Sequence, residues 1–241
     1  MQLMNGKLPL FWDAVLLRAG IRYPVIWDYE HFPHILLVGS TGSGKTYAVK
    51  LLLGRVSKYV PDAAITVCDF KADDFTFLRG CDRYYEFTDC KQGLDDFYNS
   101  FLDRQQGNNL DRSFSMLVFD EWASFLNNLE KKEAEEAKRK LATLLMLGRS
   151  YNFHILVSQQ RADAQYFSTA RDNFNTIIAL GNISKEAAGM FGFDRELMQP
   201  VYQRERGAGY LLQGGTDLTA IQVPRIRDME KLHAAIRRLV I

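Results

Sequence analysis

Residues 39–46 form a glycine-rich loop that directly follows an apolar segment. The loop matches the pattern G-x-x-x-x-G-K-[ST] at every fixed position and consists of Gly39, Ser40, Thr41, Gly42, Ser43, Gly44, Lys45 and Thr46. Residues 35–38 are apolar and of strand length, and residues 47–53 read as a helix. Strand, glycine loop and helix in this order are the context in which the pattern binds phosphate. The chain is therefore predicted to bind a nucleoside triphosphate.

The residue types of the loop suit this role. Glycines let the backbone turn so that successive N–H groups point at phosphate oxygens beside a helix N-terminus. Lys45 can reach the β- and γ-phosphates, and the Thr46 hydroxyl can ligate Mg²⁺. ATP and Mg²⁺ are the expected ligands. The alternative is a flexible Gly-Ser turn that contains a lysine by chance, and the flanking segments disfavour it.

Composition adds few constraints. The 241 residues are 47% hydrophobic and 24% charged, which is typical of one α/β domain with a large core. The net charge of +1 neither supports nor excludes DNA binding, so a DNA role would depend on local positive loops or on a ring of subunits.

The three cysteines, Cys68, Cys81 and Cys90, lack metal-ligand spacing and are expected to be reduced, buried thiols in a cytoplasmic protein. The longest apolar runs, such as residues 116–119, are far shorter than the ~20 residues of a membrane helix. The amino terminus also lacks the layout of a signal peptide. Any location at the inner face of the membrane would then be peripheral and would require another component.

Apolar runs alternate with helical patterns along the chain. Strands are expected near residues 8–12, 25–27, 34–38, 64–69, 83–87, 115–119, 154–158 and 176–180. Helices are expected near residues 47–59, 93–103, 128–147 and 229–241, with a mixed segment between residue 180 and the last helix. This alternation predicts a mostly parallel central sheet flanked by helices on both faces.

Polar residues follow several of these strands, and ligands bind at the carboxyl ends of strands in such sheets. Asp120 follows residues 116–119 and is the expected acid that holds Mg²⁺, directly or through water. Glu121 is the candidate general base for the water that attacks the γ-phosphate. Asp69 and Lys71 also lie at a strand end, but the sequence assigns them no step.

Two further candidates flank residues 154–158. The Gln160 amide can bond either the attacking water or a γ-phosphate oxygen, and the alternative is a polar residue that caps the strand end. Arg149 precedes the strand, too far back to serve its own nucleotide, but it could stabilise the transition state in a neighbouring subunit. A surface arginine without such a function fits the same position.

Taken together, these residues resemble the FtsK/SpoIIIE/HerA class of hexameric DNA-pumping ATPases. The matching segments are residues 41–46, 69–71, 118–121, 148–149 and 158–161. Residues 33–34, 171–174, 179–181 and 206–210 look most similar to the FtsK-type (TcpA-like) coupling proteins of Gram-positive conjugative elements. The resemblance covers about residues 25–224, and Phe70 stands where the family often has proline.

The resemblance implies a RecA-like P-loop NTPase core. It makes residues 29–241 the motor domain and residues 1–28 an amino-terminal appendage. By the family pattern, Lys45 and Thr46 bind nucleotide and Mg²⁺, Asp120 and Glu121 are the Walker B pair, Gln160 is the sensor glutamine and Arg149 is the trans arginine finger. A homo-hexamer is implied, with DNA as the partner, double-stranded and bound without regard to sequence.

The sequence shows neither the membrane helices usual in coupling proteins nor the DNA-orienting winged-helix module of chromosome-segregating members. Three alternatives follow from the first departure: a soluble relative, a motor cut from a larger architecture, or a motor that relies on a membrane-anchored or relaxase partner. Directional reading of DNA sequence is not expected.

The leading functional hypothesis is an ATP-driven translocase of double-stranded DNA in conjugative transfer or packaging of a mobile element. An FtsK-like protein-secretion motor is the alternative, and the near-neutral charge suits it. A third hypothesis, an inactive nucleotide-switched scaffold, is disfavoured by the intact Lys45, Asp120 and Glu121.

Overall fold

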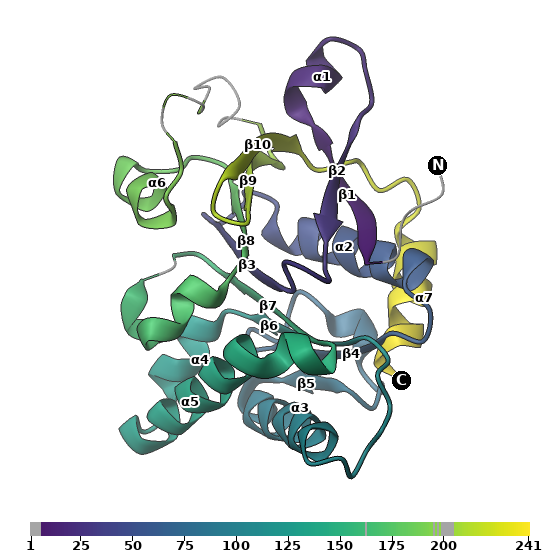
Figure 1. Cartoon of the computed structure of the whole chain (residues 1–241). Coiled ribbons are helices and arrows are strands. Elements are labelled where there is room, and N and C mark those ends of the chain that lie inside the picture. The colour runs from purple at the N-terminus through teal and green to yellow at the C-terminus, as the bar shows by residue number, and fades with distance from the viewer. Residues whose placement is uncertain (1–5, 162, 195, 197, 199–204) are drawn as a thin grey trace.

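A computed structural model describes residues 6–161, 163–194, 196, 198 and 205–241. Within these residues, ten strands form one sheet in the order β2-β1-β10-β9-β8-β3-β7-β6-β4-β5 (Figure 1). The strands are β1 Lys7–Asp13, β2 Pro24–Asp28, β3 His34–Gly39, β4 Ala64–Asp69, β5 Tyr84–Glu86, β6 Ser115–Asp120, β7 Phe153–Gln159, β8 Thr176–Leu180, β9 Ala208–Gln213 and β10 Asp217–Gln222. The helices are α1 Ala14–Arg18, α2 Lys45–Tyr59, α3 Cys90–Gln105, α4 Trp122–Asn128, α5 Lys131–Leu147, α6 Lys185–Phe191 and α7 Met229–Val240.

The six strands from β8 to β5 pair in parallel, and the remaining pairs are antiparallel. Strands β6 and β7 are buried along their whole length because helices cover both faces of the sheet. One apolar cluster packs α2 and α7 against one face, and a second packs α3, α4, α5 and α6 against the other. Figure 1 shows α3, α4 and α5 grouped on one side of the sheet, away from α2 and α7. The predicted fold class is confirmed.

The amino-terminal strands join the same sheet. β1 pairs with β2 and with β10, so the strands predicted near residues 8–12 and 25–27 extend the sheet at its edge. Helix α1 lies at the tip of the hairpin between them, which projects from the molecule (Figure 1). Residues 1–5 lie outside the described residues. The domain boundary after residue 28 stays a prediction.

Two sequence expectations need correction. The helix expected at 128–147 is α5, which begins only at Lys131 because the backbone of Leu129 and Glu130 is extended, and the short helix α4 before it was not expected. The mixed segment before the last helix contains α6 and the β9–β10 hairpin, which turns at two glycines with positive φ, Gly214 and Gly215. The hairpin gives the parallel core its antiparallel neighbour, since β9 pairs with β8.

No helix within the described part of the chain is long and apolar enough to cross a membrane. Cys68, Cys81 and Cys90 are buried free thiols, as predicted.

Candidate nucleotide site

The glycine loop connects β3 to α2, and its backbone requires glycine at specific positions. Gly42 and Gly44 have φ angles of +82° and +102°, in the left-handed region that favours glycine. A Cβ atom on Gly39 would lie 2.6 Å from the carbonyl oxygen of Leu180 on β8. The pattern seen in the sequence therefore has a direct conformational cause.

The side chains of the loop fit phosphate oxygens. Lys45 Nζ donates to the carbonyl oxygens of Gly39 at 2.6 Å and Ser40 at 3.4 Å. Burial lowers the pKa of Lys45, and the carboxylates of Glu121 and Asp120 oppose that shift. Within the described residues, the buried Ser43 Oγ has no hydrogen-bond partner. A buried ammonium and an unpartnered hydroxyl at a helix N-terminus suit an anionic ligand.

The predicted acids lie at the same edge of the sheet. Asp120 ends β6, opposite Asp69 of β4 and Ser158 of β7. Burial, followed by the charges of Glu121 and other carboxylates, raises the pKa of Asp120 to about 7. A carboxyl so deeply buried needs a cation or a proton.

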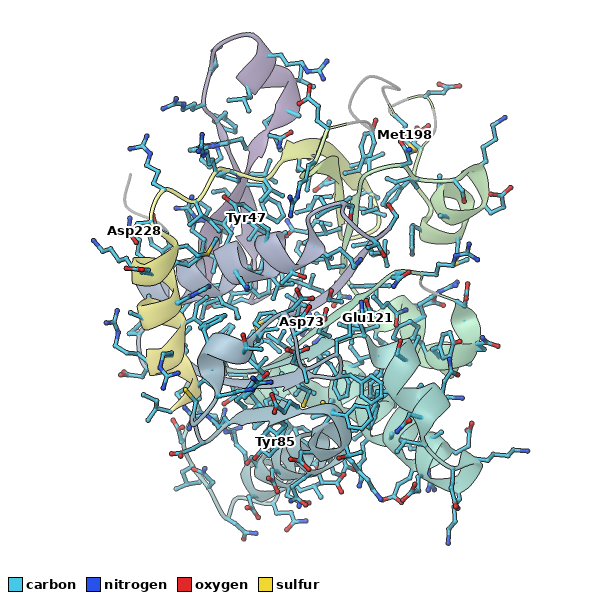
Figure 2. The ribbon with its side chains drawn as sticks, turned by 180° about the vertical axis from the view of Figure 1, so that it is seen from behind. Tyr47, Asp73, Tyr85, Glu121, Met198 and Asp228 are labelled. Carbon is cyan, nitrogen blue, oxygen red and sulfur yellow. The ribbon has the colours of Figure 1, made fainter. Side chains whose placement is uncertain are left out.

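Glu121 has an unusual backbone. Its φ and ψ angles of 60° and 48° are left-handed, and such a conformation costs a non-glycine residue about 1–3 kcal/mol. Its N–H donates to the Ser158 carbonyl at 2.7 Å, which holds it against β7. The chain thus turns directly after Asp120, and the Glu121 side chain remains 4% exposed (Figure 2).

Lys71 contacts this glutamate. Its Nζ lies 2.6 Å from Glu121 Oε1, although the lysine side chain is 43% exposed. Burial would lower the pKa of Lys71, but the hydrogen bond and charge of Glu121 raise it overall. The sequence indicated that Lys71 lies near the site but not that it pairs with the candidate base.

Asp74 is a site residue that sequence reasoning missed. Thr46 Oγ1 donates to Asp74 Oδ2 at 2.9 Å. The pair of acids at 73–74, close after Asp69 and Lys71, was the available signal.

The structure separates the other two candidates. Gln160 follows β7 and lines a cavity of about 560 Å³ together with Gly39 and Ser40. Arg149 lies before β7, in the 3₁₀ segment Gly148–Tyr151, and lines a different cavity with Arg171. Because β3 and β7 are parallel, Arg149 lies at the opposite edge of the sheet from the glycine loop. Of these two candidates, only Gln160 lies near the glycine loop of its own chain.

A segment directly before β9 contacts the glycine loop. Gly207 N–H donates to the Ser43 carbonyl at 2.9 Å, and a Cβ atom on Gly44 would lie 3.6 Å from Arg206 Cγ. Residues 206–210 were noted only as part of the family resemblance, because nothing local in the sequence links them to residues 43–44.

A glycine loop between a parallel strand and a helix, with acids at the ends of neighbouring strands, defines a P-loop ATPase. Residues 13–183 match the family model described as FtsK/SpoIIIE family, and the chain belongs to that family as an FtsK/SpoIIIE-type ATPase. The FtsK domain-containing protein YdcQ of Bacillus subtilis (strain 168) is 27% identical over 223 residues. This alignment covers 86% of the chain and 44% of YdcQ, so the chain spans less than half of that relative.

Solved structures share the fold. The pCW3 conjugation coupling protein TcpA, in its monomer form with ATPγS, has a TM-score of 0.74 at 16% identity, covering 99% of this chain and 71% of TcpA. The cytoplasmic domain of the Type VII secretion ATPase EccC of Thermomonospora curvata has a TM-score of 0.71 at 18% identity, covering 100% of this chain and 32% of EccC. EssC (ATPases 2 and 3) from Geobacillus thermodenitrificans also has a TM-score of 0.71, at 15% identity, covering 99% of this chain and 49% of EssC. These likenesses confirm the P-loop motor fold.

The Lys71–Glu121 pair is expected to stabilise the fold because Glu121 is buried. In a double-mutant cycle with Lys71→Met and Glu121→Gln, we expect a coupling of about 1–3 kcal/mol in the free energy of unfolding. The exposed Lys91–Glu133 pair is the control, with a smaller expected coupling because solvent screens an exposed ion pair. Denaturant titration measures both, and equal couplings would contradict the prediction.

Proposed function

We propose that this FtsK/SpoIIIE-type ATPase moves double-stranded DNA, in conjugative transfer or packaging of a mobile element, as a homo-hexameric ring. The observation that carries the proposal is the division of candidate residues between two edges of one sheet. Lys45, Glu121 and Gln160 lie at the edge with the glycine loop, and Arg149 lies at the other. A site divided in this way would be completed by a neighbouring subunit.

At the proposed site, Lys45 exchanges its bond to the Gly39 carbonyl for phosphate oxygens. Thr46 and Asp120 are the residues that would hold Mg²⁺. When bound, the metal neutralises charge on the β- and γ-phosphates. The raised pKa of Asp120 fits a carboxylate whose burial is offset by a cation.

Glu121 is the proposed base that takes the proton of the attacking water. Lys71 occupies its Oε1 atom, so this bond must loosen, or the water must approach Oε2. Gln160 would orient the water or a γ-phosphate oxygen through its amide. Arg149 of an adjacent subunit would stabilise charge on the transferred phosphoryl group.

The similarity to the conjugation coupling protein TcpA supports DNA as the cargo. The buried free thiols fit a cytoplasmic setting, and the proposed recruiting component is a membrane-anchored or relaxase partner. An FtsK-like protein-secretion ATPase is the second candidate. The comparable TM-scores of EccC and EssC and the net charge of +1 favour it.

Duplex DNA is expected to stimulate ATP turnover. DNA binding should weaken steeply between about 50 mM and 200 mM salt, because phosphate contacts release counterions. Absence of DNA stimulation, with turnover intact, would favour the secretion motor instead.

Glu121→Gln should retain ATP binding and lose turnover by about 10²–10⁴-fold, since it removes a general base.

Mixed rings test the trans role of Arg149. Alone, Arg149→Ala and Glu121→Gln should each be nearly inactive, with a loss of about 10³–10⁵-fold expected for an arginine finger. Mixing them should restore partial DNA-stimulated turnover, because some interfaces then pair an intact Glu121 with an intact Arg149. Arg139→Ala changes an exposed arginine on α5 that lines neither cavity, and as the control it should keep the turnover of wild type. If mixing restores nothing, Arg149 does not act between subunits.

A further inference from the structure

The hydrogen bond between Thr46 and Asp74 assigns a direction to the threonine hydroxyl. Thr46 Oγ1 lies 2.9 Å from Asp74 Oδ2, and an ionised carboxylate only accepts hydrogen bonds. The hydroxyl proton therefore points at Asp74. A hydroxyl has one proton and two lone pairs, so both lone pairs of Oγ1 are left for another ligand.

The loop that carries Asp74 is fixed by its surroundings. Asp69, the last residue of β4, accepts from the Ala72 N–H at 3.1 Å and from the Phe75 N–H at 3.0 Å. Phe75 is fully buried in the apolar core between the sheet and α2. The backbone of Asp74 thus lies between two anchored residues, Ala72 and Phe75.

Asp74 also belongs to the electrostatic environment of the site. After burial and Glu121, it is among the charges that raise the pKa of Asp120. It also opposes the lowering of the pKa of Lys45 that burial causes. The Asp74 carboxylate, in the loop after β4, therefore acts on the same groups as Asp120, at the end of β6.

We propose that Asp74 is a positioning residue of the ATP site. It accepts a hydrogen bond from the Thr46 hydroxyl, so that the lone pairs of Oγ1 face the position that Mg²⁺ takes on binding. Partners of this kind orient a ligand atom and make it a better donor to the metal, without contacting the metal themselves. This inference rests on the proposed binding of Mg²⁺ with ATP at the glycine loop.

The test measures nucleotide affinity with and without metal, on the full chain. A fluorescent ATP analogue is titrated in EDTA and at a series of Mg²⁺ concentrations, and the two together give the apparent affinity for Mg²⁺. Wild type is expected to bind more tightly in Mg²⁺. For Asp74→Ala we expect unchanged affinity in EDTA and a loss of about 10–100-fold in the apparent affinity for Mg²⁺. Asp74→Asn keeps an acceptor oxygen without the charge, and its loss should be smaller.

Controls separate positioning from structural damage. Asp73 is the exposed neighbour in the same loop, so Asp73→Ala should behave as wild type in both titrations (Figure 2). In the Thr46→Ala background, Asp74→Ala should cost no further Mg²⁺ affinity, because the oxygen that it orients is gone. Melting temperatures without nucleotide report whether each variant is folded.

Two outcomes overturn the inference. One is an Asp74→Ala or Asp74→Asn variant with the Mg²⁺ affinity of wild type. The other is a loss of equal size in Mg²⁺ and in EDTA, which would show a general effect on the loop. If wild type itself binds the analogue equally in both conditions, the proposed metal role of the site fails, and this inference fails with it. If only the prediction for Asp74 fails, while wild type binds the analogue more tightly in Mg²⁺, the proposed function still stands.

Discussion

The parallel pairing of β3 with β7 and β8 determines where every candidate side chain lies. Parallel strands bring their carboxyl ends to one edge, so the glycine loop after β3 meets the residues that follow β6 and β7. The same pairing moves Arg149, which precedes β7, to the other edge. The candidate residues of the proposed site are therefore divided between the two edges of the sheet.

At the loop edge, the side chains of three candidate site residues already have partners within the chain. Lys45 contacts loop carbonyls, Thr46 contacts Asp74, and Glu121 contacts Lys71. Such pairing lowers the cost of burying charged and polar groups when no nucleotide is present. It also means that ATP binding exchanges hydrogen bonds rather than creating all of them. Two of the three partners come from the short loop after β4.

Much of this arrangement was predictable from local patterns. The buried parallel strands appear as short apolar runs, and the loop has a fixed spacing, so the fold class and the acid pair after β6 followed directly. Contacts between segments that are distant in the sequence have no local pattern that predicts them. Asp74 lies 28 positions from Thr46, and Gly207, directly before β9, bonds to Ser43 from a distant part of the sequence. The hairpin was not predicted because β10 lacks the continuous apolar character of β6 and β7.

The most direct measurement is a structure of the chain with ATPγS and Mg²⁺. We expect the triphosphate along residues 39–46, with Lys45 Nζ moved from the Gly39 carbonyl to phosphate oxygens and Thr46 Oγ1 on the metal. Nucleotide bound elsewhere, or Lys45 still on the Gly39 carbonyl beside a bound triphosphate, would contradict the assignment of this edge as the ATP site.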